Sequence, residues 1–69
     1  MNTALFEEVE RITKEKRRKG IFPAGVQMTA LNHYEGGIEE LRADLEELER
    51  AGLVVSFPTL NSRFYAAKY

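Results

Sequence analysis

Apolar residues recur at helical spacing in the middle of the chain, between Gly36 and Val55. The stripe consists of Ile38, Leu41, Leu45 and Leu48. Their spacings of three, four and three residues predict a helix with one apolar face, because charged residues fill most of the intervening positions. Gly52 follows the pattern, where a glycine can take a positive φ and end the helix. The next residues, 53–57, are β-branched, apolar or aromatic and predict a strand.

A second amphipathic pattern predicts a helix at the N-terminus. Its apolar positions are Leu5, Phe6, Val9 and Ile12. Asn2 or Thr3 can cap this helix by accepting a hydrogen bond from a free backbone N–H of its first turn. Residues 14–19 add positive charge at the negative end of the helix dipole, and Gly20 ends the helix.

Residues 21–26 predict a connector, because Pro23 prevents a helix and Gly25 permits a turn. Ile21, Phe22 and Val26 are expected to hold this connector against the core, with room for a strand of two or three residues. Residues 27–34 are compatible with a short second helix of about two turns, although a segment of this length depends on tertiary packing.

The C-terminal part predicts a β-hairpin. The strand at residues 53–57 is followed by a segment rich in turn-forming residues, 58–63, and by an extended aromatic segment, 64–69. The aromatic side chains of the hairpin exceed what one face of two strands can bury, so some are expected at a contact between two copies of the chain.

Length and charge limit the classes of protein to consider. The 69 residues form a single domain, 1–69, and the absence of cysteine excludes disulfides and thiolate metal sites. No run approaches the roughly 18 to 20 apolar residues that span a bilayer, so we expect a cytoplasmic protein without a membrane partner. Residues 1–34 carry six Lys/Arg against four Glu, and residues 35–69 carry four against seven Asp/Glu, so the net charge changes from +2 to −3.

The order of these elements is that of a winged helix-turn-helix domain. Residues 41–54, LRADLEELERAGLV, resemble the recognition-helix segment of small prokaryotic and phage transcriptional regulators, which show an apolar-x-x-Asp-Leu-x-x-Leu-x-x-x-Gly-Leu-apolar pattern. The matching positions are Asp44, Leu45, Leu48, Gly52 and Leu53. This resemblance implies an α+β fold of three helices and a C-terminal two-stranded wing, with a short third strand near residues 21–27.

The resemblance also implies a DNA-binding transcriptional regulator, which forms a homodimer to read two half-sites. The longer helix would lie in the major groove of double-stranded DNA and the wing would contact the backbone or the minor groove. The implied DNA contacts are Thr29, Asn32, Arg42, Asn61, Ser62, Arg63 and Lys68. The candidates for phosphate contacts are Lys16, Arg17, Arg18 and Lys19.

Acidic residues early in the longer helix leave a second function open. Its outward positions include Glu39, Glu40, Glu46 and Glu47, where DNA-reading relatives offer Ser, Thr, Gln, Asn, Arg or Lys. Several carboxylates together would face phosphates of the same charge. The alternative is a protein-interaction module whose acidic helix docks a basic partner or mimics DNA. A third alternative is a structural subunit whose hairpin edge extends a sheet in an oligomer.

No pattern in the sequence indicates an enzyme, a cofactor or a metal site. His33 is the only histidine, and no second histidine or cysteine lies at ligand spacing from it. Ser56 and Ser62 have no recognisable partners for nucleophilic catalysis. A chain this short, spent largely on core and turns, has little room for a pocket with converging groups.

Overall fold

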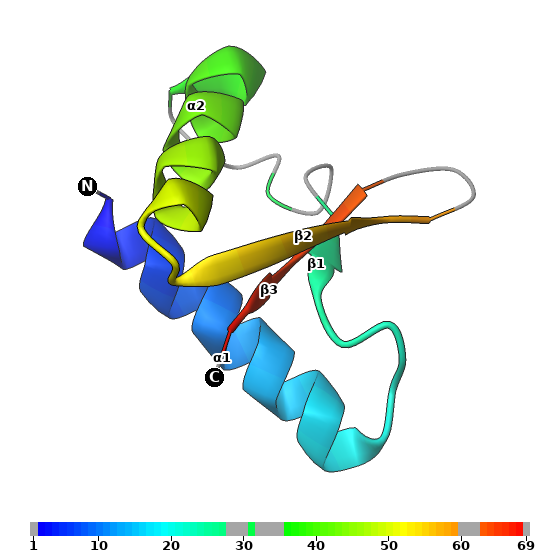
Figure 1. Cartoon of the computed structure of the whole chain (residues 1–69). Helices are drawn as coiled ribbons and strands as arrows, with labels where there is room; N and C mark the ends of the chain where they lie inside the picture. Colours follow the sequence, from blue (N-terminus) through cyan, green and yellow to red (C-terminus); the bar gives the residue numbers. More distant parts are fainter. Residues whose placement is uncertain (1, 28–30, 32–35, 60–62, 69) are drawn as a thin grey trace.

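The structure is a computed structural model that describes residues 2–27, 31, 36–59 and 63–68. Over these residues the chain is an α+β fold of two helices and one antiparallel sheet (Figure 1). Helix α1 spans Thr3–Lys19 and helix α2 spans Gly37–Arg50. The strands are β1 (Val26–Gln27), β2 (Val54–Pro58) and β3 (Arg63–Ala67). The predicted strands near residues 21–27, 53–57 and 64–69 are therefore confirmed in outline.

The prediction of three helices is wrong for the described part of the chain. Gln27, the first residue of the expected short helix, instead pairs with Phe64 as part of β1. Leu31 is buried in the core. Thr29, Asn32 and the remaining residues of that segment lie outside the described residues.

Both helices begin and end where the sequence predicts. The Asn2 side chain caps α1 by accepting a hydrogen bond from Leu5 N at 3.0 Å. Gly20 follows α1 with φ 73° and Gly52 follows α2 with φ 79°, a backbone conformation that costs glycine little. Asn2 also donates to the Asp44 carboxylate of α2 at 3.3 Å, so the cap of one helix contacts the other helix.

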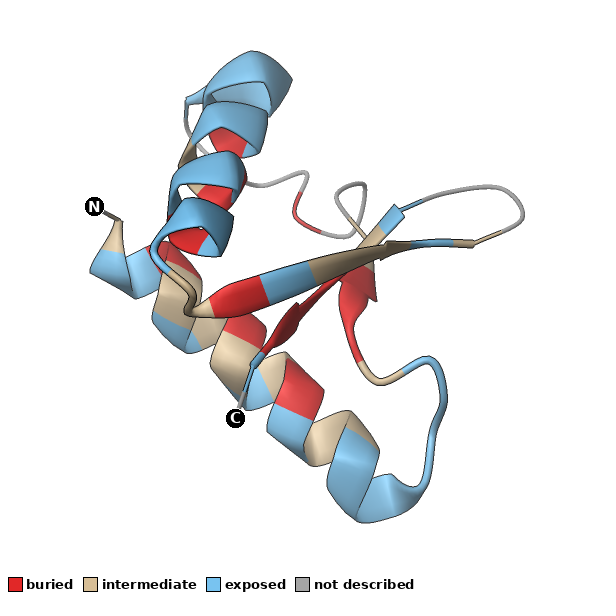
Figure 2. Ribbon diagram, viewed as in Figure 1, coloured by how far each residue is buried: buried red, intermediate tan, exposed pale blue. Residues whose placement is uncertain are grey.

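The core lies between the two helices and the sheet (Figure 2). Leu41, Leu45 and Leu48 are buried, so these three leucines of the predicted stripe face inward. Ile38, the first residue of that stripe, is 57% exposed, so its predicted burial is wrong: it lies in the first turn of α2, beyond the part of the helix that covers the sheet. The order of the strands is β1-β3-β2, which places β3 at the centre of the sheet. β3 contributes Tyr65, Ala66 and Ala67, all buried.

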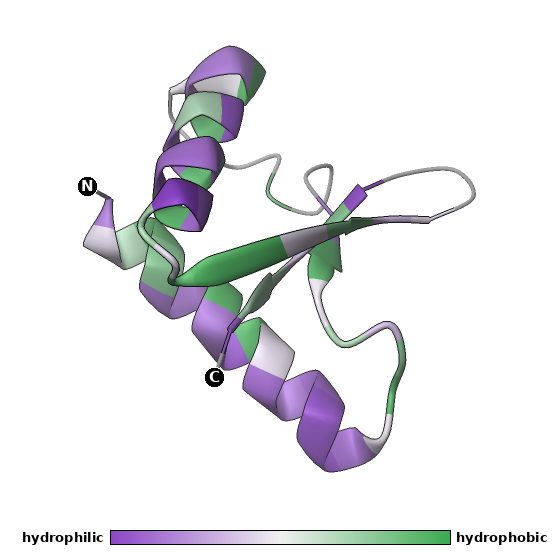
Figure 3. Cartoon of the chain, in the orientation of Figure 1, coloured by the Kyte–Doolittle hydropathy of each residue, from purple (hydrophilic) through white to green (hydrophobic). Residues whose placement is uncertain are grey.

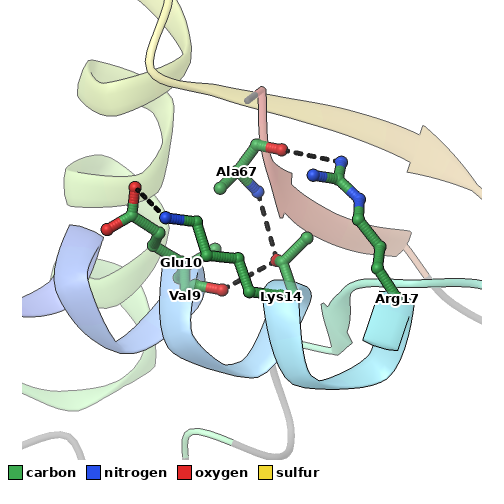
Figure 4. A network of polar contacts seen from close by, with 6 residues as sticks. Val9, Glu10, Lys14, Arg17 and Ala67 are labelled. Carbon is green, nitrogen blue, oxygen red and sulfur yellow. Dashed lines mark hydrogen bonds and ion pairs between the residues drawn. The ribbon is translucent and has the colours of Figure 1, made fainter. Parts of the chain in front are cut away.

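Side chains of α1 complete the hydrogen bonding of the central strand at Ala67. Lys68 N donates to Leu53 O at 3.0 Å, beside the pair formed by Ala67 and Val54. Hydrogen-bonded and non-hydrogen-bonded pairs alternate along an antiparallel ladder, so the N–H and C=O of Ala67 point away from β2. β1 ends before it reaches them. Thr13 Oγ1 accepts from Ala67 N at 3.2 Å, and Arg17 Nη2 donates to Ala67 O at 3.0 Å (Figure 4). Thr13, which is 0% exposed, also donates to Val9 O at 2.7 Å.

The connector after α1 differs from the expectation in one respect. Val26 is buried as predicted, but Ile21 and Phe22 are 48% and 78% exposed, so the prediction that they pack on the core is wrong. The reason is local: the turn at Gly20 reverses the chain at the end of α1, and only the residues that pair with β3 reach the core.

We expect Thr13→Val to lower the free energy of unfolding by about 1–3 kcal/mol, because the buried N–H of Ala67 loses its acceptor. Urea denaturation measures this change. Thr3→Val makes the same chemical change at an exposed position of α1 and is expected to cost less than about 0.5 kcal/mol. Equal losses in the two variants would contradict the role assigned to the Thr13 hydroxyl.

Candidate interaction surface

The outward side of α2 forms an exposed, predominantly acidic surface, which we call the acidic face. Because the leucines point into the core, the charged residues of α2 are directed to solvent. The exposed charged residues are Glu39, Glu40, Arg42, Glu46, Glu47, Glu49 and Arg50. Five carboxylates against two guanidinium groups give this face a net charge of −3. Figure 3 shows the hydrophilic residues along the outside of α2.

The hairpin is joined to the acidic face through side-chain hydrogen bonds. Ser56 Oγ of β2 donates to Glu49 Oε2 at 2.9 Å, and Arg63 Nη1 of β3 donates to the same Ser56 Oγ at 3.0 Å. These bonds are exposed, so each contributes little to stability, but together they bring one guanidinium group of the hairpin beside α2. The acidic face and the part of the hairpin that carries Ser56 and Arg63 therefore form one continuous surface.

Tyr65 lies beneath this junction. Burial raises the pKa of the Tyr65 hydroxyl, while Arg63 and Arg42 lower it and Glu49 and Glu46 raise it. Of the two arginines predicted as DNA contacts, Arg63 lies beside a glutamate, because Arg63 and Glu49 both form a hydrogen bond with Ser56 Oγ.

The basic end of α1 is largely engaged within the chain. Lys16 Nζ donates to Gly25 O at 2.6 Å and lies 5.8 Å from the centre of the Phe64 ring. Arg17 binds Ala67 O, as described above. Lys14 pairs with Glu10 at 3.6 Å, and Lys19 pairs with Glu15 at 3.1 Å. The hydrogen bond from Lys19 lowers the pKa of the Glu15 carboxyl.

Arg18 is exposed like Arg17 and Lys19 but, unlike them, makes no hydrogen bond or ion pair with the described residues. Of the predicted phosphate contacts, Lys16 and Arg17 thus donate hydrogen bonds to backbone carbonyls of this chain, and Arg18 and Lys19 face solvent.

In Figure 1 the end of α1 and the start of α2 lie at opposite ends of the molecule. The basic cluster and the acidic face are therefore separate surfaces.

The structure brings together only part of the predicted DNA-contact set. Arg42 is exposed on α2, Arg63 begins β3, and Lys68 is exposed just after β3. Thr29, Asn32, Asn61 and Ser62 lie outside the described residues. Sequence analysis missed the link through Ser56 and Glu49, because hydrogen bonding between a strand and a helix depends on how they pack.

Within residues 2–27, 31, 36–59 and 63–68, no group of three or more His, Cys, Asp or Glu side chains is arranged to hold a metal ion. No helix there combines the length and the apolar character required to cross a membrane. Comparison of the chain with models of protein families, with curated proteins and with solved structures found no match.

The raised pKa of Tyr65 predicts how stability changes in alkali. The unfolded chain releases the phenol proton near pH 10, where the folded chain still holds it, so stability falls as the pH rises through about 10. We expect Tyr65→Phe to lose less stability than the wild type between about pH 9 and 11. Urea midpoints at each pH measure the difference, and parallel losses would contradict this assignment.

Proposed function

We propose that the protein is a winged-helix module that binds other proteins, with the acidic face of α2 and the part of the hairpin that carries Ser56 and Arg63 as its binding surface. The observation that carries this proposal is the net charge of −3 on the exposed side of α2. Such a surface attracts a partner that presents lysine and arginine, and electrostatic complementarity increases the rate and specificity of association. We propose a non-catalytic role that requires no cofactor.

The separation of buried leucines from exposed glutamates on α2 supports this proposal. Its leucines are buried, so the outward glutamates are not needed for the core. Glutamates near the start of a helix are stabilised by the helix dipole, which explains Glu39 and Glu40. The dipole does not account for Glu46, Glu47 and Glu49, which extend the acidic face toward the end of α2. A surface that docks a basic partner accounts for all five.

DNA binding is the second candidate, and a specific observation favours it. Arg42 and Arg63, the groove and wing contacts implied by the resemblance, are both exposed, on α2 and at the start of β3. Phosphate contacts from Lys16, Arg17, Arg18 and Lys19 would have to come from the other end of the molecule. Against this candidate, the carboxylates around Arg42 would repel phosphates at short range, where salt screens charge least.

The two candidates predict opposite results in a direct binding comparison. We expect the wild type to bind a fluorescent lysine-rich peptide at low salt and to bind a fluorescent random DNA duplex more weakly. Reversing Glu39, Glu40, Glu46 and Glu47 to Lys should abolish peptide binding, because the attraction becomes repulsion. Fluorescence anisotropy across a salt series measures both affinities.

Controls separate charge on α2 from charge elsewhere and from unfolding. Glu7→Lys changes an exposed glutamate on α1 and should leave peptide binding nearly unchanged. Circular dichroism reports whether each variant is folded. If the wild type instead prefers the duplex and loses that binding in Arg42→Ala and Arg63→Ala, DNA binding is the function and the protein-binding proposal is wrong.

A further inference from the structure

An apolar pair stands exposed beside the basic end of α1. Ile21 and Phe22 are 48% and 78% exposed, and they directly follow Arg18, Lys19 and the turn at Gly20. We call residues Arg18, Lys19, Ile21 and Phe22 the tip. No acidic residue occurs between residues 16 and 34, so the tip combines apolar surface with positive charge. Exposed apolar surface bordered by charge is typical of interaction sites.

Hydrogen bonds hold the backbone around the tip. Ile21 N donates to Lys16 O at 2.9 Å, and Gly25 N donates to Pro23 O at 3.1 Å. Lys16 Nζ donates to Gly25 O at 2.6 Å and so closes the connector onto α1. The apolar pair is therefore held outward by a fixed backbone, which reduces the entropy that binding would cost.

The start of α2 offers a complementary surface. Ile38 is 57% exposed and directly precedes the exposed Glu39 and Glu40. This surface is apolar and acidic where the tip is apolar and basic. The two lie at opposite ends of the molecule, whose longest extent is 31 Å, so they cannot meet within one copy (Figure 1).

We propose that the tip of one copy docks on the start of α2 in a second copy of this chain. Phe22 and Ile21 contact Ile38, while Arg18 and Lys19 face Glu39 and Glu40. This inference rests on the proposed function, because it names the basic partner of the acidic face. An antiparallel arrangement of two copies makes the contact twice and closes the assembly as a dimer.

Charge-swap variants test this contact by sedimentation velocity across a concentration series at low and high salt. We expect the wild type to associate, and added salt to weaken the association. Arg18→Glu with Lys19→Glu, and Glu39→Lys with Glu40→Lys, should each remain monomeric alone. An equimolar mixture of these two variants should associate again, because each then presents the charge that the other requires.

Matched variants test the apolar part of the contact. Phe22→Ser should weaken association about ten-fold or more, because a large apolar surface is no longer buried. Val55→Thr removes another exposed apolar side chain, on β2 and away from both surfaces, and should leave association unchanged. Circular dichroism confirms that each variant is folded, so a loss of association is not a loss of structure.

Two results would overturn the contact. One is a wild type that stays monomeric at low salt, and the other is association that persists in both charge-swap variants. A monomer that still binds the lysine-rich peptide would leave the proposed function standing and remove only this inference. A monomer that binds phosphatidylglycerol vesicles through Phe22 would instead assign the tip to a membrane surface.

Discussion

The docking of α1 on the central strand is the constraint on which the remaining structure depends. β3 needs a partner on each side, but β1 supplies only two residues and ends before Ala67. Thr13 and Arg17 take over the N–H and C=O that β1 leaves unpaired. An unpaired backbone group at a position as buried as Ala67 would be costly, so this contact fixes where α1 lies along the sheet.

The position of α1 in turn determines which surfaces face outward. Asn2 at the start of α1 binds Asp44 of α2, and the leucine stripe of α2 closes the core over the sheet. The glutamates of α2 are then exposed, and Glu49 lies within hydrogen-bonding distance of β2. The other end of α1 carries the basic residues and the exposed apolar pair. The fold thus separates acidic and basic surfaces that the sequence shows only as a change of charge along the chain.

Local patterns were sufficient to predict much of the fold. The leucine spacing predicted the buried side of α2, and Gly20 and Gly52 marked the ends of the helices, because these features depend on residues close in sequence. Thr13 was missed as a core residue, although it lies four residues after Val9 and therefore on the same side of α1. Its hydroxyl is useful only because Ala67, 54 residues later, needs an acceptor.

The wrong predictions have the same cause as the missed residue Thr13, because each depends on how the elements of the chain pack in space. Ile21 and Phe22 are apolar, and only the direction of the chain after α1 shows that they face solvent. Gln27 fits a helix by local propensity but pairs with Phe64, a partner that the local sequence cannot reveal. Similarly, Arg63 could be named as a candidate contact, but its link to Glu49 through Ser56 follows from packing.

The most direct test of the account is to map the binding surface by NMR on the isotopically labelled protein. Adding a lysine-rich peptide is predicted to shift backbone amide signals along the exposed side of α2 and at Ser56 and Arg63. Adding a DNA duplex in a parallel titration is predicted to leave α2 unperturbed. Shifts along α2 with the duplex and none with the peptide would contradict the assignment of the acidic face to a basic protein partner.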